Sequence, residues 1–254
     1  FQAEDGIRDR SPSRGLGDVY KRQRMGSERL KQKNLALLDG KPLISYAINA
    51  ANESQSFDQV VVNSDGKMMS QIAERYKVDF YYRDPVLASS QTKSDDVIYD
   101  FVQHYPCDIV AWVNPISPLQ TPDEIHDVVQ YFLNNDLDSL ITVGNHQVHC
   151  VYENNPINFS TQGLFAKTQD LIPVQSFVYS VMMWKSSTFI KEYEDKGYAL
   201  LSGKLGYYAV SKESAIIIKT EEDLMIAENL LKARNNSSSY KVTYDDLSDL
   251  QVHP

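Results

Sequence analysis

The chain has 254 residues, a formal net charge of -9 at pH 7, 42% hydrophobic residues and 23% charged residues. These are ordinary values for a globular α/β domain, and no apolar run of about 18 residues is present to span a membrane. The acidic balance argues against a general nucleic-acid binder, which needs a dominant basic face. Without a signal peptide, Cys107 and Cys150 are expected to be reduced thiols in a cytoplasmic protein.

The first 23 residues stand apart from the rest of the chain. Residues 1–23 resemble a translated sequencing-adapter peptide, so we exclude them from the fold as a non-native segment. Residues 17–23, GDVYKRQ, are too polar for a buried central strand. The alternative interpretation of residues 1–23 is a natural disordered basic tail of low hydrophobicity.

Residues 24–34, RMGSERLKQKN, place four basic residues around a Gly-Ser turn. The turn at Gly26 and Ser27 lets backbone N–H groups approach an anion closely. Arg24, Arg29 and Lys33 can add charge and hydrogen bonds to a polyphosphate, which points to pyrophosphate as a leaving group. The spacing matches neither of the two common phosphate-loop motifs, and the alternative is a solvated surface loop.

Strand-like and helix-like segments alternate through the middle of the chain. Such alternation predicts an α/β fold with a mostly parallel sheet, whose strands collect ligands at their carboxyl ends. Thr121 and Pro122 predict a capped helix start. The predicted segments are residues 59–63, 67–77, 78–82, 94–104, 108–113, 122–135 and 139–143.

Polar residues follow two of the predicted strands. Asn114 and Ser117 lie in a proline-stiffened turn at the end of a central strand, where they can reach a ligand or simply stabilise the turn. Asp65 follows an earlier strand, where it can meet ribose or metal or can cap the next helix.

Residues 144–176 lose periodicity and predict an irregular excursion from the sheet. His146, His149 and Cys150 have no matching second ligand pair, so zinc is not expected. In the strand predicted after the excursion, Tyr179 and Trp184 are expected to pack in the core, with base stacking as the alternative. The tail, residues 235–254, is expected to be disordered.

Several motifs recur in one order: R-x-G-S-x-R-L-x-x-K-N from Arg24, G-K-P-L-I from Gly40, S-D from Ser64, N-P-x-S-P-L from Asn114 and T-E-E-D-L-x-x-A-E from Thr220. Each is weak alone. Together they resemble the cytidylyltransferases that activate acidic nine-carbon sugars, the CMP-N-acylneuraminate synthetase family, with the Kdo-activating enzymes as relatives. The resemblance runs from residue 24 to about residue 233.

This resemblance implies a three-layer, Rossmann-like fold of the nucleotide-diphospho-sugar transferase type over residues 24–234. It also implies a homodimer, with dimer contacts and part of the sugar pocket in the 144–176 excursion. The implied reaction is attack by the anomeric hydroxyl of a 2-keto acid sugar on the α-phosphate of CTP, with Mg²⁺ bridging the phosphates.

Residue roles follow from the same resemblance. Arg24, Arg29 and Lys33 would stabilise charge on the phosphates. Gly26 and Ser27 would offer the backbone turn and a donor, and Asn34 would fix ribose or phosphate. Asn114, where relatives commonly have Gln, would contact base or sugar beside Ser117, and Asp65 would meet ribose or metal.

One departure from the family pattern concerns the residues that would bind the metal. Relatives that activate sialic acid read S-x-D-I-D-T-E where this chain has Ile217 and Lys219 at the two aspartate positions. Neither residue can ligate Mg²⁺, and Glu221, Glu222 and Asp223 are better explained as helix-start residues.

Three explanations of the departure stay open: Mg²⁺ held mainly by the triphosphate, which we prefer; Lys219 replacing part of its charge; or a non-catalytic nucleotide- or sugar-binding relative. Another nucleotidyltransferase activity is a further alternative, and the sugar itself is not specified, because fold-level similarity does not fix a substrate.

Overall fold

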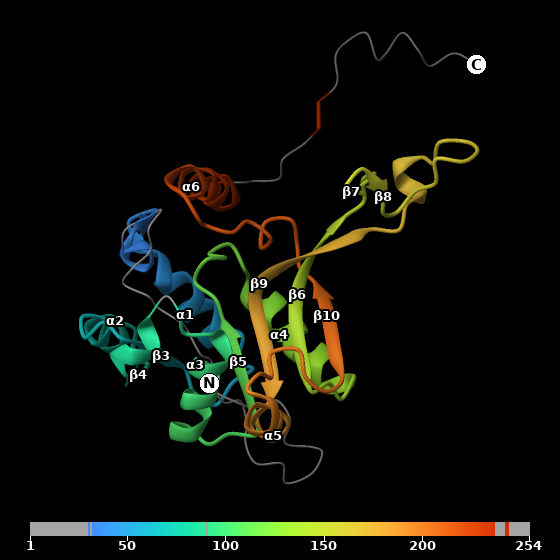
Figure 1. Cartoon of the computed structure of the whole chain (residues 1–254). Coiled ribbons are helices and arrows are strands. Elements are labelled where there is room, and N and C mark those ends of the chain that lie inside the picture. Colours follow the sequence, from blue (N-terminus) through green and yellow to red (C-terminus); the bar gives the residue numbers. More distant parts are fainter. Residues whose placement is uncertain (1–29, 31, 90, 237–241, 244–254) are drawn as a thin grey trace.

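The centre of the molecule is a mixed β-sheet. In the computed structural model, which describes residues 30, 32–89, 91–236 and 242–243, its strand order is β10-β6-β9-β5 (Figure 1). β10 (Leu205–Ala209) runs parallel to β6 (Ser139–His146), and β9 (Val174–Lys185) runs antiparallel to both β6 and β5 (Ile109–Val113). The predicted mostly parallel sheet therefore contains one long antiparallel strand.

A second sheet pairs β3 (Val61–Ser64) with β4 (Asp79–Tyr82) in parallel. Two small hairpins complete the strands. β1 (Leu37–Leu38) pairs with β2 (Lys41–Pro42), and β7 (Val151–Tyr152) pairs with β8 (Asn155–Pro156).

Helices cover both faces of the main sheet and form a three-layer arrangement. On one face, α1 (Leu43–Glu53) and α4 (Pro122–Asn134) pack on alternate residues of β5, β6 and β9. On the other face, α3 (Ser94–His104) and α5 (Ser186–Lys196) pack on the intervening residues. Because both faces are covered, β5 reads Ile-Val-Ala-Trp-Val and is buried along its whole length.

The remaining helices are peripheral. α2 (Met69–Tyr76) packs beside β3, and α6 (Glu221–Asn236) lies above α1 in Figure 1. Short 3₁₀ turns occur at Lys33–Leu35, Pro85–Ala88 and Thr168–Asp170. No helix in the described part of the chain has the length and apolarity needed to cross a lipid bilayer.

The two sheets share the same flanking helices. Val62 of β3 packs with Ile44 and Ile48 of α1, and Val61 packs with α3 and with Val110 of β5. In the described residues, however, β3 pairs only with β4 and β5 pairs only with β9. The edges of β3 and β5 that face each other therefore carry no ladder of hydrogen bonds between them.

The predicted elements agree closely with the observed ones. The segment predicted at residues 94–104 is α3, that at 122–135 is α4, and Thr121 accepts a hydrogen bond from the Glu124 N–H as the expected N-cap. Their boundaries are set by local signals, because a cap and a proline fix where a helix begins.

The excursion is more regular than predicted. β6 and β9 continue past the body of the sheet, with Gly144 opposite Ser176 and His146 opposite Val174. Figure 1 shows the resulting arm projecting from the sheet, with β7 and β8 along it. Only residues 147–173 are irregular between short elements, so the prediction of an irregular segment over all of residues 144–176 was wrong at both of its ends.

Candidate functional site

Three segments that lie far apart in the sequence meet beyond the carboxyl end of β5. The ammonium Nζ of Lys33 donates to the carbonyl oxygen of Ile218 at 2.9 Å. The Ile218 N–H in turn donates to the carbonyl oxygen of Ile116 at 2.8 Å. Lys33 is thereby held beside the 114–120 turn.

Most of the basic loop lies outside the part of the chain that the structure describes. Arg24, Gly26, Ser27 and Arg29 lie outside the described residues. Asn34 lies within them and is buried, and its Oδ1 has no hydrogen-bond partner among the described residues. A buried acceptor without a partner costs about 1–3 kcal/mol, so a ligand donor at Asn34 would be favourable.

The 114–120 turn is tied to β9. The Asn114 N–H donates to the Ser180 carbonyl at 2.7 Å, and the Asn114 Oδ1 accepts from the Ile116 N–H at 3.3 Å. Gln120 donates through Nε2 to the Ser180 hydroxyl at 3.3 Å, and that hydroxyl also lies 2.9 Å from the Thr142 hydroxyl. The buried Ser117 hydroxyl has no partner among the described residues.

Asp65 is held by a residue that the sequence reasoning missed. Arg83, directly after β4, is fully buried; its Nη2 lies 3.3 Å from the Asp65 Oδ1, and its Nη1 lies 3.2 Å from the Asn63 Oδ1. Asn63 is also fully buried, and its Nδ2 has no partner among the described residues. The available signal was a basic residue at the carboxyl end of a predicted strand.

The alternative that Asp65 caps the next helix is wrong. The residue at the N-cap of α2 is Met68, and no side chain caps that end. Asp65 instead pairs with Arg83 beside β3 and β4, on the second sheet, whereas Asn114 and Ser117 follow β5 in the main sheet. The structure thus gathers Lys33, Asn114 and Ser117 around Ile116, while Asp65 and Arg83 form a separate pair.

The described residues show no cluster of metal-binding side chains. They contain no group of three or more His, Cys, Asp or Glu side chains that could hold a metal ion. Asp223 is occupied at the start of α6, where its Oδ2 accepts from the N–H groups of Lys219 and Thr220, both at 2.8 Å. The expected helix-start role of Asp223 is confirmed.

The aromatic residues of β9 divide between core and surface. Trp184 is buried, packs edge-on against Phe189 and donates to the Leu200 carbonyl at 2.9 Å, so its predicted core role is confirmed. Tyr179 is 42% exposed and has a φ of 59° where the pairing of β6 with β9 shifts register. The prediction of core packing was wrong for Tyr179, because a bulge turns it outward.

Comparison with a family model decides the relationship. The model described as "Cytidylyltransferase" matches residues 22–220. The chain belongs to this cytidylyltransferase family. The matched region includes the 3₁₀ turn at Lys33–Leu35, β5 and the 114–120 turn.

Individual relatives are more distant. The chain is 24% identical over 239 residues to an N-acylneuraminate cytidylyltransferase of Streptococcus agalactiae serotype V, covering 88% of this chain and 57% of that protein. It is 26% identical over 226 residues to the enzyme of that name from Escherichia coli O18:K1:H7, covering 84% and 51%. The chain spans about half the length of these curated relatives.

Solved structures establish the fold of this chain. CMP:2-keto-3-deoxy-manno-octonic acid synthetase complexed with CTP matches with a TM-score of 0.65 and 13% identity, over 86% of this chain and 99% of that one. The 4-diphosphocytidyl-2C-methyl-D-erythritol synthase of Anaerococcus prevotii matches with a TM-score of 0.62 and 11% identity, over 85% and 98%. The predicted nucleotidyltransferase-type, Rossmann-like fold is confirmed.

Proposed function

We propose that this chain transfers CMP from CTP to an acidic 2-keto sugar and releases pyrophosphate. The observation that carries the proposal is the junction of Lys33, Ile218 and Ile116, which sets a basic side chain beside the 114–120 turn in a member of the cytidylyltransferase family. The names of the relatives, N-acylneuraminate cytidylyltransferase and a CMP-sugar synthetase, support an acidic sugar as the acceptor.

In this reaction an anomeric oxygen of the sugar forms a bond to the α-phosphorus of CTP, the bond to the pyrophosphate oxygen breaks, and the hydroxyl proton is lost. Catalysis of phosphoryl transfer rests on positioning and on charge stabilisation. Lys33, with Arg24 and Arg29, would stabilise charge on the phosphates, with Gly26 and Ser27 contributing the backbone turn.

The polar residues of the two sheets would hold the substrates. Asn34 and Ser117 each present a buried oxygen without a partner among the described residues, which a ligand could satisfy. Asn114 would contact base or sugar beside Ser117. Asp65 lies against Arg83, and together they offer a paired carboxylate and guanidinium for ribose or base rather than for a metal.

One observation favours a second candidate, a non-catalytic nucleotide- or sugar-binding relative. Ile217 and Lys219 stand at positions where the resembling enzymes carry aspartates, and the described residues include no carboxylate cluster in their place. Such a protein would bind CTP or sugar without releasing pyrophosphate.

The first test measures Mg²⁺-dependent pyrophosphate release from CTP with a panel of 2-keto acid sugars that includes N-acylneuraminate, legionaminate, pseudaminate and Kdo. Release with one sugar would support the transferase and identify the acceptor. Binding of CTP without release from any sugar would contradict it and favour the non-catalytic relative.

Lys33→Ala separates the same two functions at one residue. If Lys33 stabilises the triphosphate, we expect a fall in kcat/KM of about a hundredfold or more, the effect of removing one charge-stabilising group from a transition state. Lys41→Ala is the matched control, because Lys41 is an exposed lysine in the nearby strand β2. Equal activity of the two variants would contradict the role of Lys33.

We also propose that Mg²⁺ arrives with the triphosphate and is held mainly by phosphate oxygens, because the described side chains do not supply its usual carboxylates. This can be measured through CTP affinity. Introducing Ile217→Asp and Lys219→Asp should make CTP binding more dependent on Mg²⁺ than it is in the parent, as judged by titration with and without a chelator.

The projecting arm supports the proposal of a homodimer. Large apolar side chains on it are exposed, among them Leu164 (99%), Ile172 (79%) and Phe165 (71%), which suits contact with a second copy of the chain. Sedimentation of the parent and of Leu164→Asp would measure this directly, with a monomeric parent contradicting it.

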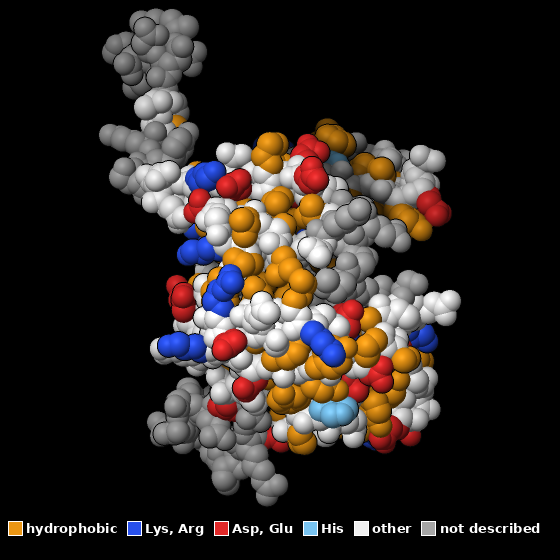
Figure 2. All heavy atoms as spheres, turned by 90° about the vertical axis from the view of Figure 1, so that its left-hand side faces the viewer, with side chains coloured by type: hydrophobic (Ala, Val, Ile, Leu, Met, Phe, Trp, Pro, Cys, Tyr) orange, Lys and Arg blue, Asp and Glu red, His pale blue; other side chains and the backbone are white. Residues whose placement is uncertain are grey.

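Other partners and the location follow from charge and cysteine chemistry. On the face shown in Figure 2, Lys and Arg side chains are interspersed with Asp and Glu, which does not suit nucleic acid as a partner. Cys107 and Cys150 are both free thiols, as expected in a reducing compartment, and we propose a cytoplasmic location.

A further inference from the structure

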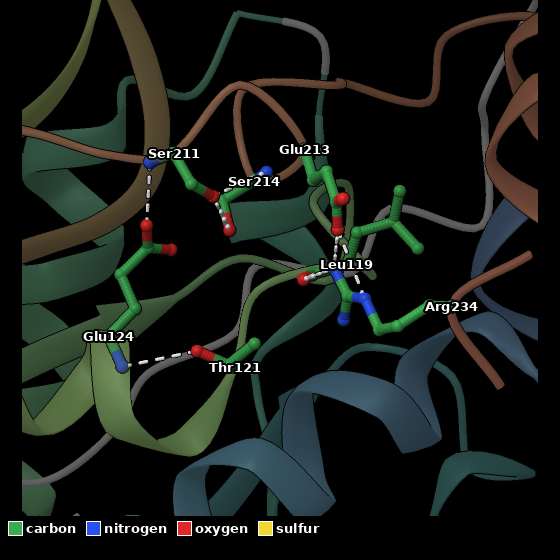
Figure 3. A network of polar contacts seen from close by, with 7 residues as sticks. All are labelled: Leu119, Thr121, Glu124, Ser211, Glu213, Ser214 and Arg234. Carbon is green, nitrogen blue, oxygen red and sulfur yellow. Dashed lines mark hydrogen bonds and ion pairs between the residues drawn. The ribbon is translucent and has the colours of Figure 1, made fainter. Parts of the chain in front are cut away.

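Arg234, in the last turn of α6, reaches across to the turn that carries the candidate site. Its Nη2 donates to the carbonyl oxygen of Leu119 at 2.9 Å. Its Nε donates to the Glu213 Oε2 at 3.0 Å, and the same carboxylate oxygen forms an ion pair with Nη2. Figure 3 shows the guanidinium between the Glu213 carboxylate and the Leu119 carbonyl. One side chain thus joins α6, the segment after β10 and the 114–120 turn.

Hydrogen bonds also hold the segment that contains Glu213 against α4 and against the 114–120 turn. The Ser211 N–H donates to the Glu124 Oε1 of α4 at 2.6 Å, and the Ser214 N–H donates to the Ser211 hydroxyl at 3.2 Å (Figure 3). Beyond Glu213, Ile218 donates to Ile116. Residues 211–218 therefore lie against both α4 and the turn.

The backbone hydrogen bonds within the 114–120 turn are long. The Ser117 N–H donates to the Asn114 carbonyl at 3.2 Å, and the Gln120 N–H donates to the Ser117 carbonyl at 3.4 Å. Both distances are at or beyond the long end of the usual range for such hydrogen bonds. The position of Ser117 consequently depends on contacts from outside the turn, and Arg234 supplies one of them at the Leu119 carbonyl.

We propose that Arg234 and Glu213 form a clamp that positions the 114–120 turn for its substrate. They act as positioning residues, since Arg234 donates to the turn at the Leu119 carbonyl and Glu213 pairs with Arg234. This inference rests on the proposed function only in assigning a substrate to the turn. The clamp itself rests on the hydrogen bonds that Arg234 donates to Leu119 and Glu213.

Because the pair of Arg234 and Glu213 is partly exposed, its effect on the position of the turn can be separated from its effect on overall stability. The side chains of Arg234 and Glu213 are 34% and 49% exposed, and an ion pair with that much access to solvent contributes little to the free energy of unfolding. An arginine is also required by the geometry. Its planar fork reaches two acceptors at once, whereas the ammonium of a lysine is a single point charge.

The test compares Arg234→Met, Arg234→Lys and Glu213→Gln with the control Lys232→Met. Lys232 pairs with Glu228 at 3.0 Å on the same helix, so the control removes an ion pair from α6 without touching the turn. We would measure kcat and KM for CTP and for the sugar, the urea unfolding midpoint, and backbone amide exchange of Ser117 and Gln120.

The clamp predicts that Arg234→Met raises the KM for the sugar about tenfold relative to Lys232→Met, and speeds amide exchange at Ser117 and Gln120, with the unfolding midpoint unchanged. Arg234→Lys should be intermediate, and Glu213→Gln should add little to Arg234→Met, because the two residues act through one contact. Equal KM values and exchange rates in Arg234→Met and Lys232→Met would overturn the clamp. So would a loss of stability that accounts for all of the changes.

The proposed function can fail separately. If the parent releases no pyrophosphate with any sugar, the transferase proposal is contradicted. Amide exchange needs no activity, so the comparison of Arg234→Met with Lys232→Met still decides whether Arg234 holds the turn.

Discussion

At the scale of single residues, the pair formed by Arg83 and Asp65 is held by burial. Arg83 is fully buried, and the Asp65 side chain is only 13% exposed. Removing one member of a buried ion pair leaves the other charge without compensation and typically costs about 3–5 kcal/mol. Asp65 keeps some contact with water, so we expect Arg83→Met to lower the free energy of unfolding by about 3 kcal/mol, measured by urea unfolding.

The control for this prediction is Lys185→Met. Lys185 pairs with Asp136, whose side chain is 85% exposed, and more distantly with Asp138 at 3.8 Å, so the loss should be at most about 1 kcal/mol. Adding Asp65→Asn to Arg83→Met should restore part of the lost stability, because the uncompensated carboxylate is then neutral. If Asp65→Asn restores no stability, or if Arg83→Met and Lys185→Met lose the same amount, the ion pair of Arg83 with Asp65 does not stabilise the fold.

At the scale of elements, the start of α6 is fixed by Asp223 and Thr220. The Asp223 N–H donates to the Thr220 hydroxyl at 3.2 Å while the Asp223 carboxylate accepts from the Thr220 N–H, which is the reciprocal pattern of a capping box. Burial raises the pKa of Asp223, but hydrogen bonds from the backbone of Lys219 and Thr220 and from the Thr220 hydroxyl outweigh it and hold the pKa below its ordinary value.

This gives a prediction with a defined pH dependence. Asp223→Ala should lower the free energy of unfolding by about 1 kcal/mol at neutral pH, the usual effect of losing a cap. A carboxyl with a lowered pKa stabilises the fold above the pKa of the unfolded chain, and this stabilisation is lost as the pH falls through the lowered value. The difference between parent and variant should therefore disappear in strong acid.

Glu222→Ala is the matched control, because Glu222 lies in the same first turn of α6 and acts only through the helix dipole. Its effect should stay below about 0.5 kcal/mol. Urea unfolding of both variants from neutral pH to strong acid makes the comparison, and a constant effect of Asp223→Ala at every pH would contradict the assignment.

Most elements could be predicted from the sequence because their signals are local. Thr121 and Pro122 mark the start of α4, and the apolar run of β5 marks a strand covered on both faces. The residues that could not be predicted depend on long-range geometry. Arg83 meets Asp65 only because β3 and β4 pair, and Tyr179 faces outward only because β9 shifts register against β6.

The residues of the candidate site also divide into those that the sequence predicted and those that it did not. Only the structure shows that Lys33 lies beside the 114–120 turn. The sequence predicted that Asn114 and Ser117 follow a central strand, where they can reach a ligand. It gave no indication of Arg234, whose contact with Leu119 spans 115 positions in the sequence. A contact between residues so far apart produces no periodic pattern in the sequence, so only the folded structure reveals it.

At the scale of the whole molecule, the main sheet and the sheet of β3 and β4 are separated between β5 and β3. α1 packs on β3 through Ile44 and Ile48 and on β5 through Ala47, Ala50 and Ala51. A helix is about 10 Å across, and strands in a sheet lie about 4.8 Å apart. Among the described residues, helices that contact both β3 and β5 therefore leave room for one strand between them, and buried backbone groups along both edges require partners.

We predict that a strand-forming segment introduced before the basic loop would enter this gap, because Lys33 lies beyond the carboxyl end of β5. Residues 17–23 carry Asp18, Lys21, Arg22 and Gln23, which do not suit a strand between two apolar helix layers. We expect an apolar variant to be more stable than a threonine variant in urea unfolding, and to protect the amides of β3 and β5 from exchange. The apolar variant carries Gly17→Val, Asp18→Ile, Lys21→Val, Arg22→Ile and Gln23→Ala.

The threonine variant changes the same positions to Thr, which keeps β-strand propensity but adds hydroxyls. Each hydroxyl buried without a partner costs about 1–3 kcal/mol, so the two variants should differ by about 3 kcal/mol or more if the segment enters the gap. If it stays in solvent, the apolar and threonine variants will unfold at the same urea concentration and exchange alike. In that case the gap between β3 and β5 must be closed by some other part of the chain, and the basic loop must be held in place without a strand before it.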